Sequence, residues 1–294
     1  MRSMTEKKAG MRRVGVVTDS TADIPEQMAL DLGIDVVPCQ VFFGEKVYRD
    51  GLDLAPESFY EKLARSPELP RTSQPAVSSF VQVYRRLLEQ ENYETVVSIH
   101  VAGNLSGTLN SAWAAAQAMP EPRQIEILDS GQVSMGMGWA VIQAARRAQN
   151  GASGDEVAEW ARSSLPRLRT VAMIDTLENL YKGGRISQFS AAIGSALQIK
   201  PLVSLQAGEL SVLARVRTRS RALNALVDRV REWGGVADIA ALHAGAEDLL
   251  EVLVGQLRTI LPDQEMLVLP AGPALTTHLG LGAVGVCALL EADA

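Results

Sequence analysis

The stretch VGVVTDSTADIPEQMALDLG, residues 14–33, holds a strand, a loop and a helix in that order. Its opening apolar run stops at the capping cluster TDST, residues 18–21, and Pro25 and Gly33 bound the helical stretch that follows. The same order returns twice, because runs of β-branched or apolar residues at 95–101 and 125–128 also precede a loop and a helix. Strands that alternate with helices in this way predict a parallel sheet with right-handed crossovers and helices on both faces.

Between these units, residues 34–43 read as one extended segment, and Pro56 and Pro75 each open a helix. Ser153 followed by Glu156 has the spacing of a capping box at the start of a further helix.

After about residue 170 strands and helices no longer alternate regularly, which predicts a mixed sheet. The expected elements are a strand at 170–174, a helix at 187–198, a hairpin at 202–216 turning at Ala207 and Gly208, helices at 220–233 and 247–261, and strands at 239–243, 266–269 and 284–290. The predicted fold class is therefore α/β with two domains. An N-terminal domain at 13–166 holds a parallel sheet flanked by helices, a C-terminal domain at 167–294 holds the mixed α/β sheet, and residues 1–12 form a flexible tail.

Composition excludes several classes of function. A net charge of -6 on 294 residues argues against nucleic-acid binding by phosphate neutralisation. The isolated Cys39 and Cys287, like the scattered His100, His243 and His278, lack the spacing of a metal or redox motif, so we expect no metal site. No apolar run reaches the roughly 20 residues that a membrane span needs, so the expectation is a protein of the reducing cytoplasm that does not span a membrane.

Four loops at predicted strand ends are rich in hydroxyl groups. They are residues 18–21, 72–75 (TSQP), 105–108 (LSGT) and the pair Asp129 and Ser130. The structural interpretation of each loop is that it caps the following helix. The second and third also suit a carboxylate or phosphate, because a small hydroxyl, a glycine and free helix amides can surround an anion. No phosphate-binding loop and no nucleophile elbow is present.

Two further features have a structural and a functional interpretation. His278 lies in a predicted glycine-bearing loop, TTHLGLG at 276–282, either as a structural hydrogen-bonding residue or as a ligand contact. Arg185 ends the sequence KGGR, and Arg215, Arg217, Arg219 and Arg221 form an alternating basic stripe. These arginines either protect a solvated turn and a strand edge or dock a phosphate-carrying or acidic partner.

Taken together, five motifs in order resemble the DegV family of bacterial proteins. They are VTDST at 17–21, PRTSQP at 70–75, LSGT at 105–108 with Ser111 and Ala112, GGR at 183–185 and THLG at 277–280. The match runs from Arg13 to Leu290, and it departs from the family pattern at Ala76 and Leu281.

This resemblance implies the two-domain fold of that family (the EDD fold), with one long-chain fatty acid such as palmitate in a tunnel between the domains. It implies that Thr72, Ser106 and His278 hold the carboxylate and that a separate fatty acid kinase phosphorylates it. The loops implied to support the site contain Ser73, Gly107, Thr108, Asp129, Ser130 and Thr277. Arg185, Arg217 and Arg219 are the expected kinase-docking residues.

The physical chemistry agrees with a lipid carrier without catalysis or cofactor. Each methylene removed from water contributes about 0.8 kcal/mol, and the buried carboxylate is tolerated only where several donors meet it. Apolar segments at 191–199 and 284–290 are candidates for the tunnel wall or for plain core. The alternatives are an acyl transferase or hydrolase with Ser106 as nucleophile and His278 as base, which lacks an orienting acid at a motif-like spacing, and an interaction protein without a closed pocket.

Overall fold

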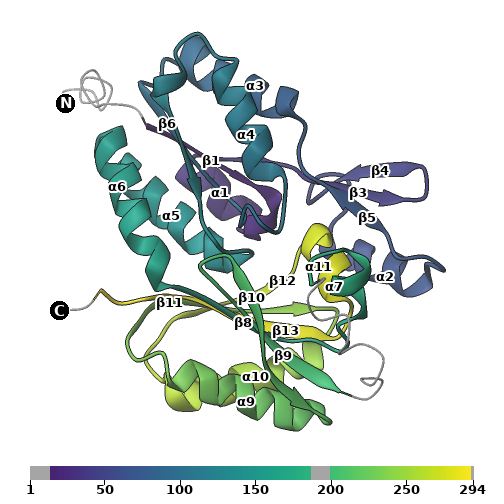
Figure 1. Ribbon diagram of the computed structural model, residues 1–294. Coiled ribbons are helices and arrows are strands. Elements are labelled where there is room, and N and C mark those ends of the chain that lie inside the picture. Colours follow the sequence, from purple (N-terminus) through teal and green to yellow (C-terminus); the bar gives the residue numbers. More distant parts are fainter. Residues whose placement is uncertain (1–13, 187–198, 293–294) are drawn as a thin grey trace, which may run out of the picture.

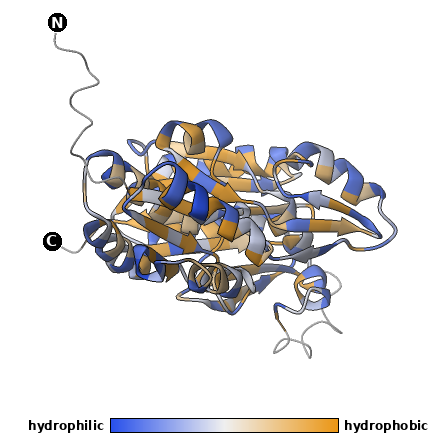
Figure 2. Cartoon of the chain, turned by 90° about the horizontal axis from the view of Figure 1, so that it is seen from above, coloured by the Kyte–Doolittle hydropathy of each residue, from blue (hydrophilic) through white to orange (hydrophobic). Residues whose placement is uncertain are grey.

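The computed structural model describes residues 14–186 and 199–292. The elements stack in layers, in the order helices, parallel sheet, helices, mixed sheet, helices (Figure 1). Strands are mainly hydrophobic, whereas the helices turn hydrophilic faces outward (Figure 2). Among the described residues, no helix is both long and apolar enough to cross a membrane.

The first sheet is parallel throughout, as predicted. In sheet order its strands are β2 (Ile34–Val37), β1 (Val14–Asp19), β6 (Thr95–His100) and β7 (Ile125–Asp129). Side chains alternate along β1, so Val17 packs on one face against α3 (Val77–Arg85) and α4 (Thr108–Gln117), while Val16 packs on the other. That second face is covered by α1 (Glu26–Leu32), α5 (Met135–Gln149) and α6 (Gly154–Ser164).

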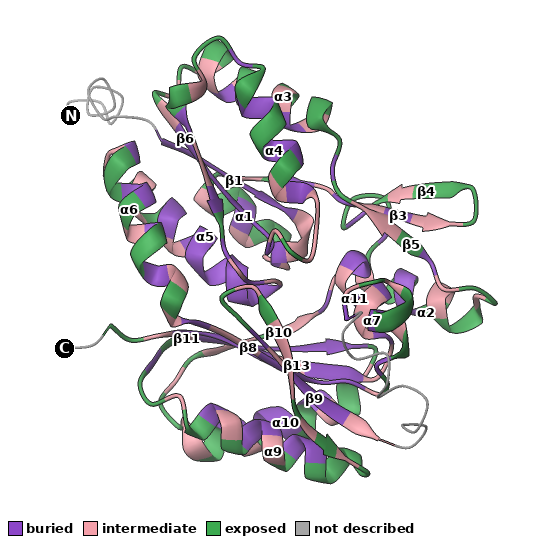
Figure 3. Cartoon of the chain, viewed as in Figure 1, coloured by how far each residue is buried: buried purple, intermediate pink, exposed green. Residues whose placement is uncertain are grey.

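Helix α5 is buried between the two sheets. Ten of its fifteen residues are buried, and its core cluster contains side chains from β1 and β6 as well as from the mixed sheet (Figure 3). Glycines permit this close approach: a Cβ at Gly138 would lie 2.8 Å from the carbonyl oxygen of Ala22, and one at Gly136 would overlap Oγ1 of Thr170. The apolar core is therefore continuous from one sheet to the other.

The second sheet is mixed, as predicted. In sheet order its strands are β10 (Glu209–Val216), β9 (Lys200–Gln206), β8 (Leu168–Met173), β13 (Ala283–Leu290), β11 (Val236–Ala244) and β12 (Met266–Pro270). Among the described strands of this sheet, only β11 and β12 pair in parallel. Helices α9 (Arg219–Arg231) and α10 (Glu247–Ile260) cover the face turned away from α5. The predicted hairpin is confirmed, since Ala207 and Gly208 both adopt positive φ between β9 and β10.

A small third sheet was not predicted. It is antiparallel, with the order β4 (Lys46–Arg49), β3 (Gln40–Phe43) and β5 (Arg71–Ser73), and it lies beside α2 (Pro56–Arg65) and α11 (Pro273–Leu279) (Figure 1). The expectation of one extended segment at 34–43 was wrong. Its two halves, β2 and β3, belong to different sheets, and Pro38, which has no backbone N–H, stands between them.

Other predicted features fall outside what the structure describes. The tail at 1–12 and the helix at 187–198 lie there. The division at 166/167 stays a prediction: all strands of the parallel sheet precede it and all strands of the mixed sheet follow it, yet both sheets share the core around α5.

The predicted capping box at the start of α6 is confirmed. The backbone N–H of Glu156 donates to Ser153 Oγ, and Ser153 N–H donates to the Glu156 carboxylate at 2.8 Å. We predict that Ser153→Ala lowers the free energy of unfolding by about 1 kcal/mol, because it removes one cap bond. Chemical denaturation measures this, with Ser163→Ala on the same helix as control, expected within about 0.5 kcal/mol of the parent. Equal losses in the two variants would contradict the capping role.

Candidate functional site

An apolar pocket lies between the loops of the parallel sheet and the inner face of the mixed sheet. Its volume is about 1130 Å³, including the part open to solvent. Strands β8, β9, β11 and β13 provide one wall, and the loops after β1, β6 and β7 provide the other. Helix α11, strand β5 and Arg185 lie at one end.

Small residues at several positions of the mixed sheet help to make room for the pocket. Gly285 of β13 pairs with Ala172 of β8, and Ala283 of the same strand pairs with Ala244 of β11. A Cβ at Gly285 would already lie 3.1 Å from the Cβ of Ala172. Strands buried on both faces normally carry Val, Ile and Leu at such positions. Small side chains here leave a space that neither α5 nor the neighbouring loops fill.

The three residues expected to hold a carboxylate come together at the mouth of this pocket. Thr72 lies on β5, Ser106 opens the loop before α4, and His278 lies on α11; all three line the pocket and are half-buried. Thr72 Oγ1 and His278 Nε2 are 2.8 Å apart, although 206 positions separate them in sequence. Ser106 Oγ lies 2.9 Å from Thr108 Oγ1 and accepts a hydrogen bond from the Thr108 amide.

The expectation that His278 lies in a loop was wrong. It occupies the last turn of α11, a helix with Pro273 in its first turn and with Gly280, at φ 76°, after its end. Proline at a helix start and glycine just past its end are a usual pair of boundaries. The helix fixes the direction of the imidazole towards β5.

Burial, followed by the positive charge of Arg185, lowers the pKa of His278 to about 4. The ring is therefore neutral near neutral pH. Its Nδ1 atom is buried, faces Gly183 and has no hydrogen-bond partner in the described part of the chain. We assign the proton to Nε2, which then donates to Thr72 Oγ1, because a buried N–H without an acceptor is the rarer arrangement. This leaves the Thr72 hydroxyl hydrogen available for another acceptor.

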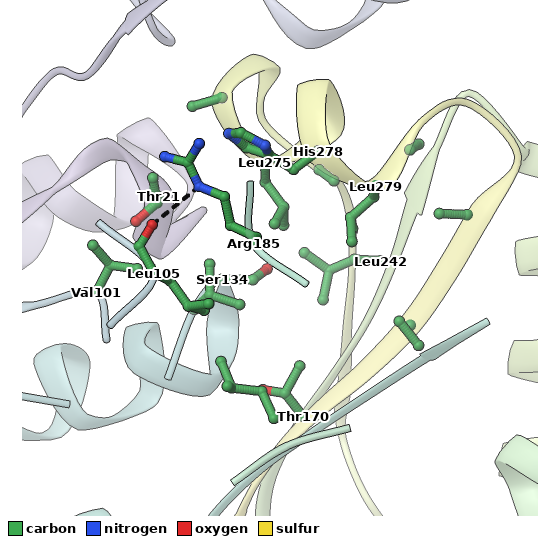
Figure 4. Close-up of a pocket in the computed structure, with 18 of the residues that line it drawn as sticks. Thr21, Val101, Leu105, Ser134, Thr170, Arg185, Leu242, Leu275, His278 and Leu279 are labelled. Atoms are coloured by element: carbon green, nitrogen blue, oxygen red, sulfur yellow. Dashed lines mark hydrogen bonds between the residues drawn. The ribbon is translucent and has the colours of Figure 1, made fainter. Parts of the chain in front are cut away.

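Arg185 belongs to the pocket, which its sequence position did not reveal. Its guanidinium donates from Nε to the Leu105 carbonyl at 3.1 Å and from Nη1 to the Gly183 carbonyl. Figure 4 shows it beside His278 at one end of the cavity. Gly184 in the preceding turn has φ 75°, a conformation that glycine allows and that turns the chain here.

The other two arginines expected at a docking surface lie elsewhere. Arg219 forms a two-pronged ion pair with Asp175, with 2.7 Å between Nη2 and Oδ2, so its charge is matched within the chain. Arg217 is exposed on the link between β10 and α9.

The supporting loops divide into two groups. Ser73 lines the pocket, buried Thr108 bonds to Ser106, and a Cβ at Gly107 would lie 3.0 Å from the Gln74 side chain. Asp129, Ser130 and Thr277 do not line the pocket. Asp129 accepts from the amides of Gly103 and Gly131, Ser130 accepts from the Gln132 amide, and Thr277 donates to the Pro273 carbonyl. These three shape the backbone around the site.

Two carboxylates, those of half-buried Asp23 and buried Asp50, hold the start of α11, and sequence patterns gave no indication of them. Asp23 accepts from Ser134 Oγ at 2.6 Å and from the Gly272 amide at 3.0 Å. Asp50 accepts from Ser20 Oγ at 2.7 Å and from the Ala274 amide at 3.2 Å. Both link the N-terminal half of the chain to the helix that carries His278. Burial raises the pKa of Asp23 to about 7 and that of Asp50 to about 6.

A serine hydrolase arrangement is absent from the part of the chain that the structure describes. No carboxylate contacts Nδ1 of His278, and the hydroxyl bonded to its Nε2 belongs to Thr72. His100 is structural, since Asp19 and Ser98 bond to its two nitrogens inside the core. Within residues 14–186 and 199–292, no group of three His, Cys, Asp or Glu side chains is placed to hold a metal ion.

The fold and the pocket together define an α/β protein with two main sheets and an internal cavity, whose mouth carries hydroxyl, imidazole and guanidinium groups. The chain belongs to the DegV family: the family model, described as "Uncharacterised protein, DegV family", matches residues 13–291. A DegV domain-containing protein of Caldanaerobacter subterraneus is 34% identical over 279 residues, which are 94% of this chain and 98% of that protein.

Solved structures give the same result. A DegV family protein from Thermus thermophilus, described by its fatty acid binding, superimposes with a TM-score of 0.85 at 32% identity over 95% of this chain and 100% of that one. DegV from Bacillus subtilis, described as a fatty acid binding protein, has a TM-score of 0.85 at 33% identity, with 96% and 100% of the two chains covered. The family and the fold expected from the motifs are thus confirmed.

We predict that Asp23 makes the protein less stable as pH rises from about 4 to about 7, an effect that the lowered pKa of His278 opposes between about 4 and about 6.5. The folded state holds the Asp23 proton up to a pKa of about 7, whereas the unfolded state releases it near about 3.9, so the stabilisation is complete below the lower value and lost through the upper one. Each unit of difference corresponds to about 1.4 kcal/mol. Denaturation at several pH values should show a smaller fall in Asp23→Asn and the parental fall in Asp263→Asn, an exposed control. Identical pH profiles for Asp23→Asn and the parent would contradict this.

Proposed function

We propose that this protein binds one long-chain fatty acid in the pocket and presents its carboxylate to a separate kinase. The observation that carries the proposal is an apolar cavity with a polar end, where Thr72 contacts His278 and Arg185 bonds to the carbonyl of Leu105, the neighbour of Ser106. The relatives from Thermus thermophilus and Bacillus subtilis, which are described as binding fatty acids, support the same ligand class.

Energetics favour an amphipathic ligand over a wholly apolar one. An acyl chain of roughly fifteen methylenes gains on the order of 12 kcal/mol from leaving water, before ordering costs are subtracted. A carboxylate at the mouth requires donors, and the Thr72 and Ser106 hydroxyls serve as such. Because His278 is neutral, its role is to orient Thr72. The compensating positive charge comes from Arg185.

The mouth is half-buried, which suits a reaction in which a second protein phosphorylates the bound carboxylate. A carboxylate held there must remain within reach of a partner that carries the phosphate donor, and none of Thr72, Ser106 and His278 is fully buried. Exposed Arg217 is the remaining candidate for docking such a kinase, since Arg219 is paired and Arg185 faces the pocket. In this proposal the chain is a cytoplasmic carrier and performs no catalysis itself.

Loss of the Thr72 hydroxyl tests the head-group site. In Thr72→Val, we expect the affinity for palmitate to fall tenfold or more, because a bond to a charged group is lost and the imidazole N–H loses its acceptor. Titration calorimetry measures this, with Thr259→Val, which changes an exposed threonine of α10, as the matched control. Unchanged affinity in Thr72→Val, or absence of lipid from both purified and palmitate-treated parent protein, would refute the proposal.

Arg185 supplies charge, so its loss should discriminate between head groups. We predict that Arg185→Gln weakens palmitate binding by about tenfold to a hundredfold and leaves the affinity for the fatty alcohol of equal length nearly unchanged. Arg217→Gln, which changes an exposed arginine, should affect neither ligand. A parallel loss for acid and alcohol in Arg185→Gln would show that Arg185 acts by shaping the pocket.

A further inference from the structure

The pocket ends where the inner face of the mixed sheet passes under α5. Thr170 on β8 pairs with Cys287 on β13 and Leu205 on β9, and all three residues line the pocket. At the next inward-facing position the pair is Leu168 and Leu289, which belong to the core cluster around α5. The cavity therefore ends at Thr170, and packed core side chains occupy the space beyond it.

Gln132, at the start of the segment that leads into α5, lies behind Thr170 at this end. Its Oε1 accepts the Thr170 hydroxyl at 2.8 Å, and its Nε2 donates to the carbonyls of Leu168 and Leu205 at 3.3 and 3.1 Å. Gln132 is fully buried, and Gly136 behind it leaves no room for a side chain against Thr170 Oγ1. The Thr170 side chain therefore has no room to move towards α5, and its hydroxyl hydrogen is already donated to Gln132.

The polar mouth is at the other end. Figure 4 places Arg185, His278 and Leu275 together on one side of the cavity and Thr170 on the opposite side, with Ser134 and Leu242 between them in this view. A ligand whose head group lies beside His278 therefore extends its tail towards Thr170.

We infer that Thr170 is a specificity-determining residue, which stops the terminal methyl of the acyl chain and so sets the longest fatty acid that fits. This inference rests on the proposed function. An end wall whose polar atoms are all bonded to the chain accepts a methyl group and disfavours a polar terminus, because a second polar group would find no partner there.

The test uses three substitutions of Thr170 and a series of saturated straight-chain acids from lauric to arachidic acid. Thr170→Ile extends the side chain by one methylene relative to its isostere Thr170→Val, and Thr170→Ser removes the methyl but keeps the hydroxyl. Each protein is equilibrated with the equimolar mixture, and bound acids are extracted and identified by mass spectrometry. Individual affinities follow by calorimetry.

We expect Thr170→Ile to shift the preferred length to shorter chains and to lose about fourfold in affinity for each methylene that no longer fits. Thr170→Ser should shift it to longer chains. Thr170→Val should keep the parental length profile while lowering the thermal midpoint, because Gln132 loses its donor.

Two results would overturn the inference while leaving fatty-acid binding intact. One is a parental length profile in both Thr170→Ile and Thr170→Ser. The other is a uniform loss for all lengths in Thr170→Ile together with no shift in Thr170→Ser. If the parent protein binds none of the acids, the proposed function falls and the role of Thr170 falls with it.

Discussion

The architecture depends on the burial of α5 between two sheets. A helix that is apolar on nearly all sides, with Gly136 and Gly138 where backbones and side chains approach most closely, belongs inside a protein rather than on its surface. It packs on the parallel sheet with one side and on the Leu168 end of the mixed sheet with another. Because it covers only part of the mixed sheet, the remaining inner face becomes the wall of a cavity. One packing interaction thus produces both the continuous core and the pocket.

The mouth of the pocket is assembled across long sequence distances. Strand β5 brings Thr72, helix α11 brings His278, and the turn after α7 (Glu178–Lys182) brings Arg185. The position of α11 in turn depends on Asp23 and Asp50, whose carboxylates accept the first amides of that helix from the opposite half of the chain. Removing these carboxylates from water costs free energy, and their hydrogen bonds to the start of α11 offset part of that cost.

Much of the fold was predictable from the sequence, because hydrophobic periodicity and capping residues act locally. The parallel sheet, the hairpin at Ala207 and Gly208 and the capping box at Ser153 all follow from neighbouring residues. The small sheet was missed because its strands are short and depend on packing against α2 and α11 for burial. The resemblance to the DegV motifs implied Thr72, Ser106 and His278 as site residues, and the structure brings all three to one pocket. The positions of Arg185, Arg219 and Asp23 depend on tertiary partners, namely Leu105, Asp175 and Gly272, that no local pattern reveals.

The small residues at Ala172, Gly285, Ala244 and Ala283 have a consequence for the lifetime of the chain. A core that forgoes large side chains gives up the contacts they would have made, and an unfilled hollow of this kind makes a fold easier to unfold. Any guest that occupies the hollow restores those contacts and favours the folded chain by mass action. In the proposed function the fatty acid is such a guest, and its binding would lower the unfolded fraction that proteases degrade.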